Sequence, residues 1–411
     1  MERETNITVI DSLMGTGKTS YAIQYMNEAS ESESFIYITP LLSEIDRIQG
    51  AVENRDFEAP SVKGNSGRKM DDLKRLLTMG ADIATTHSLF QAADGEVIEL
   101  LKDGGYTLIL DETMDVVEPV SVKKADIEKL IRSGDIRIED GHRVIWTGDA
   151  NDDSRYADIR IMAQAGNLYC HRDTFFAWAF PPNVFSAIDN VIVLTYLFKG
   201  SILRYYFDMF GFEYKFKAVN CNEDRRYELV EYDASKEDRL RLFSLMSIYE
   251  GRKNDIGNRG NTFSSTWLRN ADLEKLKEIR NNLYGFFQND CGAKKSEVYY
   301  STLNELEKTI APKGYKQTSS GTQVVIPLNC RATNDFADRK YIAYLYNRYL
   351  NPNVKGFFQD RGVTVDEDLY AVGDLLQWIF RSQIRNGEPI KMYIPNSRMR
   401  GLLIDWAKGR I

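Results

Sequence analysis

The stretch "DSLMGTGKTS", residues 11–20, lies between an apolar run and a run with helical character. Before it, "NITVI" (residues 6–10) is β-branched and apolar, which is typical of a short buried strand. After it, "YAIQYMNEAS" (residues 21–30) has no Gly or Pro and carries apolar residues at helical spacing. The order of strand, glycine turn, Lys-Thr and helix predicts a loop whose backbone N–H groups surround a phosphate at the start of the helix.

The residue types in this loop are those of a nucleoside triphosphate site. In the pattern G-x-x-x-x-G-K-[ST], Ser12 stands in place of the first Gly, and the last three positions match. We expect Lys18 to reach the β- and γ-phosphates and the Thr19 hydroxyl to hold Mg²⁺. A glycine turn that caps a helix and binds nothing is the alternative, which the position between strand and helix disfavours. The predicted nucleotide-binding residues of the loop are Met14, Gly15, Thr16, Gly17, Lys18, Thr19 and Ser20.

The composition is that of a globular protein with room for two or three domains. The chain has 411 residues, of which 43% are hydrophobic and 27% charged, and a net charge of −7. This acidic balance argues against a large nonspecific basic surface but leaves room for nucleic acid in a narrow cleft. No stretch is long and apolar enough to span a membrane, and the charged start predicts no signal peptide. The scattered cysteines predict neither zinc nor disulfides, so we expect a cytoplasmic protein.

Polar motifs follow several of the predicted strands downstream. The segments "SFIYITPLLSEIDRI" (34–48), "GADIATTHSLFQAA" (80–93) and "GGYTLILDETMDVVEPV" (104–120) each begin with an apolar strand. Strands that alternate with helices predict a parallel sheet with helices on both faces, and ligands bind at the carboxyl ends of such strands. The phosphate loop and the pairs Thr39-Pro40, Thr85-Thr86 and Asp111-Glu112 should therefore lie at one edge of the sheet.

The pair Asp111-Glu112 ends the most apolar of these strands, "TLIL". An Asp at this place suits a Mg²⁺ contact beside the nucleotide, usually through water. The adjacent Glu can polarise the water that attacks the phosphate. The alternative is a carboxylate pair in an ordinary loop, and the upstream phosphate loop favours the catalytic interpretation.

The order of these segments resembles that of superfamily 2 helicases of the type encoded by phages of Gram-positive bacteria. "MGTGKTS" (14–20), "IYITPLLSEID" (36–46), "IATTHSLF" (83–90) and "LILDETMD" (108–115) are similar to motifs I, Ia, Ic and II of that family. "NVIVLTYLFKGSILRYYFDMFG" (190–211) resembles motif III, where Thr195 is the position that carries over.

The second half of the chain continues the resemblance. "KSEVYYSTLNELEKTI" (295–310) is similar to motif IV, and "VVIPLNCRATNDFADRKYIAYL" (324–345) to motif V, with Thr333 and Asn334 at its strand end. "DLLQWIFRSQIRNGEPIKMYIP" (374–395) resembles motif VI, Q-x-x-G-R-x-x-R, although Phe380 replaces the Gly and the second Arg comes one position late. The resemblance implies catalytic roles for Gln377, Arg381 and Arg385, with both arginines on one helix face.

The resemblance implies an α/β fold of two RecA-like parallel-sheet domains with an insertion in the first. We place the first domain at residues 1–220 and the second, with helical decoration, at 221–411. The distance between motifs II and III predicts an insertion at about 120–185, with a small helix and a hairpin. The aromatic stretch "YCHRDTFFAWAFPPNVF" (169–185) could stack on bases, but core packing of its rings is the favoured interpretation.

These features predict an ATP- and Mg²⁺-dependent helicase or translocase that acts on single-stranded or forked nucleic acid, which we expect to be DNA in phage replication or recombination. Two alternatives remain open: a P-loop switch or small-molecule kinase, and an origin-binding remodeller that does not separate strands. The sequence does not decide DNA against RNA, the direction of movement or a replication-protein partner. The predicted nucleic-acid contacts are Thr39, Pro40, Thr85, Thr86, Thr302 and Thr333.

Overall fold

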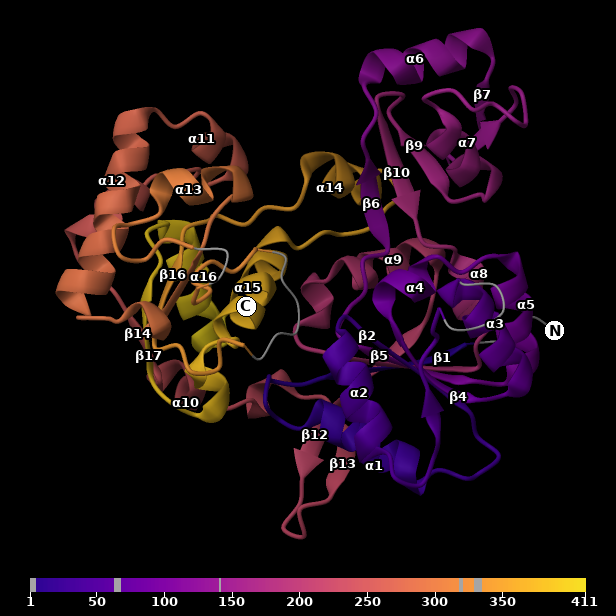
Figure 1. Ribbon diagram of the computed structural model, residues 1–411, viewed down its shortest axis with the longest axis horizontal. Helices are drawn as coiled ribbons and strands as arrows, with labels where there is room; N and C mark the ends of the chain where they lie inside the picture. Colours follow the sequence, from indigo (N-terminus) through magenta and orange to yellow (C-terminus); the bar gives the residue numbers. More distant parts are fainter. Residues whose placement is uncertain (1–4, 63–67, 140–141, 318–320, 329–334) are drawn as a thin grey trace. The chain divides into compact units, whose positions relative to one another are not determined.

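The computed structural model describes residues 5–62, 68–139, 142–317, 321–328 and 335–411 (Figure 1). The chain forms two compact units. Unit 1 comprises Met1–Ser12, Thr16–Tyr232 and Leu350–Val365, and unit 2 comprises Leu13–Gly15, Asp233–Tyr349 and Asp366–Ile411. Residues 350–365 thus belong to unit 1, although they lie within the range predicted for the second domain.

Unit 1 is built on an eight-stranded sheet in the order β13-β12-β1-β11-β5-β2-β4-β3. Neighbouring strands are parallel throughout, except that β12 and β13 form an antiparallel hairpin. The expected α/β class with parallel sheets is confirmed. The strands are β1 (Asn6–Asp11), β2 (Phe35–Thr39), β3 (Phe57–Glu58), β4 (Asp82–Thr86), β5 (Thr107–Asp111), β11 (Asn190–Thr195), β12 (Tyr214–Cys221) and β13 (Tyr227–Glu231).

The central strands of this sheet are buried because helices supply apolar side chains to them. All five residues of β2 and the first four of β5 are buried, as expected for strands covered on both faces. Met26 of the first helix and Ile48 of the second pack on Tyr37 of β2 in one core cluster. The helices of unit 1 outside its insertion are α1 (Lys18–Glu28), α2 (Leu42–Ala51), α3 (Lys69–Met79), α4 (His87–Gln91), α5 (Gly95–Gly104), α8 (Pro182–Ser186), α9 (Ile202–Phe210) and α14 (Pro352–Gln359).

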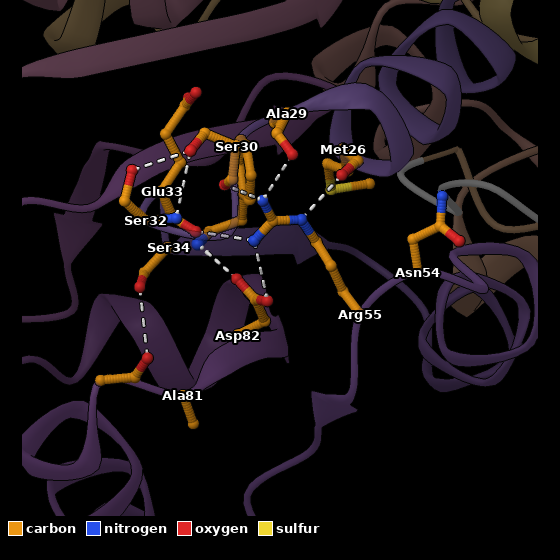
Figure 2. A network of polar contacts seen from close by, with 12 residues as sticks. Met26, Ala29, Ser30, Ser32, Glu33, Ser34, Asn54, Arg55, Ala81 and Asp82 are labelled. Carbon is orange, nitrogen blue, oxygen red and sulfur yellow. Dashed lines mark hydrogen bonds and ion pairs between the residues drawn. The ribbon is translucent and has the colours of Figure 1, made fainter.

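A buried arginine fixes the far end of α1, the helix that follows the phosphate loop (Figure 2). The Arg55 guanidinium donates to the backbone oxygens of Met26 at 2.7 Å and Ala29 at 3.1 Å, at the carboxyl end of that helix. It also donates to the carbonyl of Glu33 at 2.6 Å and pairs with Asp82 at 3.2 Å. The carbonyl groups that a helix end leaves without intrahelical partners are thereby satisfied, and α1 is tied to the chain that enters β2.

The segment between β5 and β11 forms a small α/β subdomain within unit 1. Its three-stranded sheet has the order β6-β10-β9 and carries a helix, a hairpin and a second helix. Phe176 and Phe180 are buried, which agrees with core packing. Arg172 of the insertion forms two 2.8 Å hydrogen bonds with Asp360, just after α14. The elements are β6 (Val117–Val120), α6 (Lys124–Ser133), β7 (Ile136–Ile138), β8 (Val144–Trp146), α7 (Ala157–Gln164), β9 (Leu168–His171) and β10 (Phe175–Ala179).

Unit 2 contains a four-stranded parallel sheet in the order β14-β17-β16-β15. Its strands are β14 (Met246–Ile248), β15 (Val298–Ser301), β16 (Tyr341–Tyr344) and β17 (Ile390–Tyr393). Its helices are α10 (Arg239–Ser244), α11 (Ser265–Arg269), α12 (Leu273–Tyr284), α13 (Glu307–Ile310), α15 (Glu367–Ile379) and α16 (Ser397–Ala407). In the part of the chain that the structure describes, no helix combines the length and apolar character needed to cross a bilayer.

Candidate functional site

The predicted phosphate loop connects β1 to α1 in unit 1. Gly15 and Gly17 have φ angles of 81° and 93°, a region that favours glycine, and Gly17 is the N-cap of α1. The ammonium group of Lys18 donates to the backbone oxygen of Ser12 at 2.6 Å, so this side chain lies over the loop. The loop thus places a cation beside the start of a helix, an arrangement suited to binding phosphate.

Two residues at the end of β1 fix the base of the loop. The carboxylate of Asp11 accepts hydrogen bonds from the backbone N–H groups of Leu197 at 2.8 Å and Phe198 at 2.9 Å. Leu197 has a φ of 56°, an unusual value for a branched residue that these bonds help to hold. The hydroxyl of Ser12 accepts from the N–H of Val219 on β12 at 2.9 Å. Ser12 therefore has a structural role that a glycine would not fill.

Asp111, at the end of β5, is held by two residues that the sequence interpretation did not single out. The Tyr37 hydroxyl donates to Asp111 Oδ2 at 2.8 Å, and Tyr37 is 0% exposed. The Nε2 atom of buried His87 lies at hydrogen-bond distance, 3.1 Å, from the backbone oxygen of Asp111. Both partners lie close in sequence to the polar strand ends at Thr39 and Thr86. Their roles depend on contacts across 74 and 24 residues, for which the local pattern holds no signal.

The carboxyl group of Asp111 is electrostatically perturbed. Burial, and then the charge of neighbouring Glu112, raise its pKa to about 7. The hydrogen bond from Tyr37 and the positive charge of Lys18 act in the opposite direction. The strands β1 and β5, which end before the loop and at Asp111, both neighbour β11 in the sheet. Perturbed carboxylates of this kind are frequent at functional sites.

Glu112 adopts a left-handed backbone conformation with a φ of 65°. Its N–H donates to the carbonyl of Leu194 on β11 at 3.0 Å, and its Oε2 atom is buried. Non-glycine residues in this conformation carry a strain of about 1–3 kcal/mol and cluster at active sites. The left-handed conformation thus occurs at Glu112, the residue predicted to polarise water.

The predicted nucleic-acid residues of unit 1 follow β2 and β4, which are neighbours in the sheet. Thr39 and Thr85 are buried, whereas Pro40 and Thr86 are partly exposed. The Thr86 hydroxyl caps α4 by accepting from the N–H of Leu89 at 3.4 Å. Of these four residues, only Pro40 and Thr86 are accessible to a nucleic-acid strand that binds at this end of the sheet. Thr39 and Thr85 are buried next to them in the sequence.

The predicted residues of unit 2 lie on and after α15. Gln377 is on this helix, and Arg381 follows it in a turn because α15 ends at Ile379. The Ser382 hydroxyl accepts from the N–H of Ile384 at 3.4 Å and starts a 3₁₀ helix, η7 (Gln383–Asn386), that carries Arg385. The expectation that both arginines share one helix is therefore wrong.

The two arginines of unit 2 differ in their surroundings. Arg381 is only 6% exposed, and its Nε and Nη1 atoms meet no hydrogen-bond acceptor among the described residues. Arg385 is exposed. Thr302 is buried directly after β15, whereas Thr333 and Asn334 lie outside the described residues. A buried guanidinium with unused donors is costly unless a ligand supplies acceptors.

The residues present fit a nucleotide with Mg²⁺ better than a metal held by protein alone. Among the described residues, no group of three or more His, Cys, Asp or Glu could hold a metal ion. Mg²⁺ usually takes one or two carboxylates, waters and phosphate oxygens. The Thr19 hydroxyl at the start of α1 and the Asp111 carboxylate are the predicted protein part of such a set.

Comparison with one solved structure, that of Xpd4, supports the fold. The structure of Xpd4 from S. tokodaii aligns over 98% of this chain and 94% of that chain, with a TM-score of 0.51 and 11% identity. The DUF1998 helicase MrfA, solved with DNA and AMPPNP, aligns over 98% of this chain and 48% of its own, with a TM-score of 0.34 and 12% identity. At this identity, the likeness to Xpd4 shows a shared fold alone.

Sequence comparison gives the family. Residues 117–178 match the family described as the YonV middle domain, and residues 240–407 match the YonV C-terminal Rossmann-like domain. The SPbeta prophage-derived protein YonV of Bacillus subtilis (strain 168) is 36% identical over 423 residues, with all of both chains covered. This relative comes from a prophage, in agreement with the expected phage origin. The chain belongs to the YonV family.

Proposed function

We propose that the protein is a nucleic-acid-stimulated ATPase that acts as a helicase or translocase, with DNA as its polymer. The observation that carries the proposal is the gathering of Lys18, Asp111 and Glu112 at one edge of the unit 1 sheet. The strands β1 and β5 that deliver them both flank β11. A cation at a glycine loop, a carboxylate suited to Mg²⁺ and a second carboxylate beside it are the parts that phosphoryl transfer requires.

Each residue has a distinct role in this proposal. Lys18 and the N–H groups of the loop bind the β- and γ-phosphates, and the helix start adds its positive dipole. Thr19 and Asp111 would hold Mg²⁺, which neutralises charge on the phosphates when bound. Glu112 orients the attacking water and accepts its proton, and the strained backbone helps to fix its carboxylate in place.

From unit 2, we propose that Arg381 stabilises the charge that develops on the transferring phosphoryl group. Its burial and its unused Nε and Nη1 donors support this role, because a preformed, desolvated cation is effective in a transition state. Gln377 is a candidate for positioning the same groups. Exposed Arg385 is the less suitable of the two arginines, since solvent screens its charge.

We place the nucleic acid along the ends of β2 and β4 in unit 1 and beyond β15 in unit 2. In unit 1, Pro40 and Thr86 are the accessible residues of this set, and Thr39 and Thr85 are buried beside them in sequence; in unit 2, Thr302 is buried. Hydroxyl and backbone groups of this kind contact phosphates and sugars, so binding should be salt-dependent and tolerant of sequence.

The test is the steady-state rate of ATP hydrolysis with and without single-stranded DNA, in parallel for the unaltered protein and Lys18→Ala. We expect DNA to raise the rate of ATP hydrolysis at least severalfold, and Lys18→Ala to abolish hydrolysis. A rate of ATP hydrolysis that neither DNA nor RNA changes would favour the P-loop switch. Stimulation without unwinding of a forked duplex would favour the remodeller.

A further inference from the structure

The hairpin formed by β12 and β13 lies beside α1, the helix that follows the phosphate loop (Figure 1). Val219 of β12 donates to the Ser12 hydroxyl at 2.9 Å, at the start of the loop. Arg226, before β13, reaches both carboxylate oxygens of Glu28 on α1 at 2.8 Å. None of the predicted helicase motifs includes this hairpin, so its close attachment to the loop needs its own explanation.

Tyr227, the first residue of β13, brings an aromatic ring against the last glycine of the loop. A Cβ atom on Gly17 would lie 2.1 Å from the ring carbon Cε1 and 2.8 Å from Cζ. The Gln24 side chain donates to the Tyr227 carbonyl and accepts from its N–H, both at 3.0 Å. Both backbone groups of Tyr227 are thus fixed to α1, which orders the ring before any ligand binds.

Tyr227 is partly buried. It packs at the margin of the core cluster that contains Met26 and Tyr37. An aromatic residue held beside a phosphate-binding loop can offer its ring to a flat partner.

The position of the loop indicates that partner. Phosphates bound by the loop lie at the N-terminus of α1, and the nucleoside attached to them must leave the loop beside the first turn of this helix. Tyr227 lies at that turn, between Gly17 and Gln24. We propose that Tyr227 is the platform on which the base of the bound nucleotide stacks. This inference rests on the proposed function and deepens it by assigning a base subsite.

The experiment compares two ligands, ATP and inorganic tripolyphosphate with Mg²⁺, which share the phosphate chain but differ in the base. Dissociation constants are measured for the unaltered protein, Tyr227→Leu, Tyr227→Phe and Arg226→Ala. The leucine variant keeps apolar packing but has no π face, the phenylalanine variant keeps the ring, and Arg226→Ala loosens the hairpin without touching the ring. Thermal denaturation checks that each variant folds.

We expect Tyr227→Leu to weaken ATP binding by about 5- to 150-fold, the range that one stacked base contributes, and to leave tripolyphosphate binding within about twofold. Tyr227→Phe and Arg226→Ala should bind both ligands almost as the unaltered protein does. An equal loss of both ligands in Tyr227→Leu would show that the ring only supports the loop and would overturn the proposal, as would unchanged ATP binding. If Tyr227→Leu does not fold, weaker ATP binding in Tyr227→Phe than in Arg226→Ala would also overturn it. Unaltered protein that binds neither ligand would instead refute the proposed function itself.

Discussion

The hydrogen bond from Tyr37 to Asp111 can be removed with little change in shape, by Tyr37→Phe. The bond is 2.8 Å long, and Tyr37 is 0% exposed. A hydrogen bond to a charged acceptor contributes about 1.5–3 kcal/mol, and one pKa unit corresponds to about 1.4 kcal/mol. Because this bond stabilises the carboxylate, its loss should raise the Asp111 pKa by roughly 1–2 units above its present value of about 7.

The assay is the pH–rate profile of ATP hydrolysis between pH 6 and 9.5, at limiting and at saturating Mg²⁺. In the proposed mechanism, hydrolysis requires the carboxylate form of Asp111, because protons compete with the metal for this group. At limiting Mg²⁺ the acid limb of Tyr37→Phe should therefore move upward by about 1–2 pH units, and at saturating Mg²⁺ the difference should shrink. Superimposable profiles for the variant and the unaltered protein would refute this reasoning.

The same shift predicts a pH dependence of folding without nucleotide. The folded-state pKa of Asp111, about 7, exceeds the ordinary value of 3.8. The stabilising contribution of this group is therefore fully present below about pH 4 and is lost as the pH rises through about 7. In Tyr37→Phe the loss should extend to about pH 8–9, which urea denaturation at a series of pH values would detect.

Four further predictions follow from individual contacts. Lys18→Ala should abolish hydrolysis and leave the urea midpoint unchanged, and an active variant would contradict the phosphate-loop assignment. Glu112→Gln should bind ATP, lose most turnover and dissociate more slowly from nucleic acid; normal turnover would place the base elsewhere. At least one of Arg381→Ala and Arg385→Ala should bind ATP but hydrolyse it about 10³–10⁵-fold more slowly. We expect this variant to be Arg381→Ala. Normal rates of hydrolysis in both variants would exclude a role for unit 2 in catalysis. Arg55→Ala removes the ion-pair partner of Asp82 and the donor to the carbonyls of Met26, Ala29 and Glu33, so the free energy of unfolding should fall by about 3–5 kcal/mol; a loss below 1 kcal/mol by urea denaturation would contradict that role.

The parts of the site that the sequence predicts are those made by contiguous residues. The strand, glycine turn and helix around Lys18 form one local unit, and the apolar run before Asp111 marks a buried strand end. The alternation of strands and helices also predicts the parallel sheets, because few other arrangements bury both faces of a sheet beneath helices.

The remaining parts depend on contacts between distant residues. In the sequence, Tyr37 resembles any other buried strand residue. Its hydrogen bond to Asp111 can form only because β2 and β5 are neighbours in the sheet. The end of α15 before Arg381 is similarly hidden, because "WIFRSQIR" contains no Gly or Pro and the hydroxyl of Ser382 starts a new turn. The left-handed backbone at Glu112 has no residue signature at all.

We propose that ATP hydrolysis moves this protein along nucleic acid. This movement can be measured directly as the release of streptavidin from the biotinylated ends of single-stranded DNA, followed over time with ATP, with a non-hydrolysable ATP analogue and with Glu112→Gln. We expect rapid release from one end only with ATP and the unaltered protein, and release at the spontaneous rate in the other two reactions. ATP hydrolysis that DNA stimulates but that never displaces streptavidin from either end would contradict it.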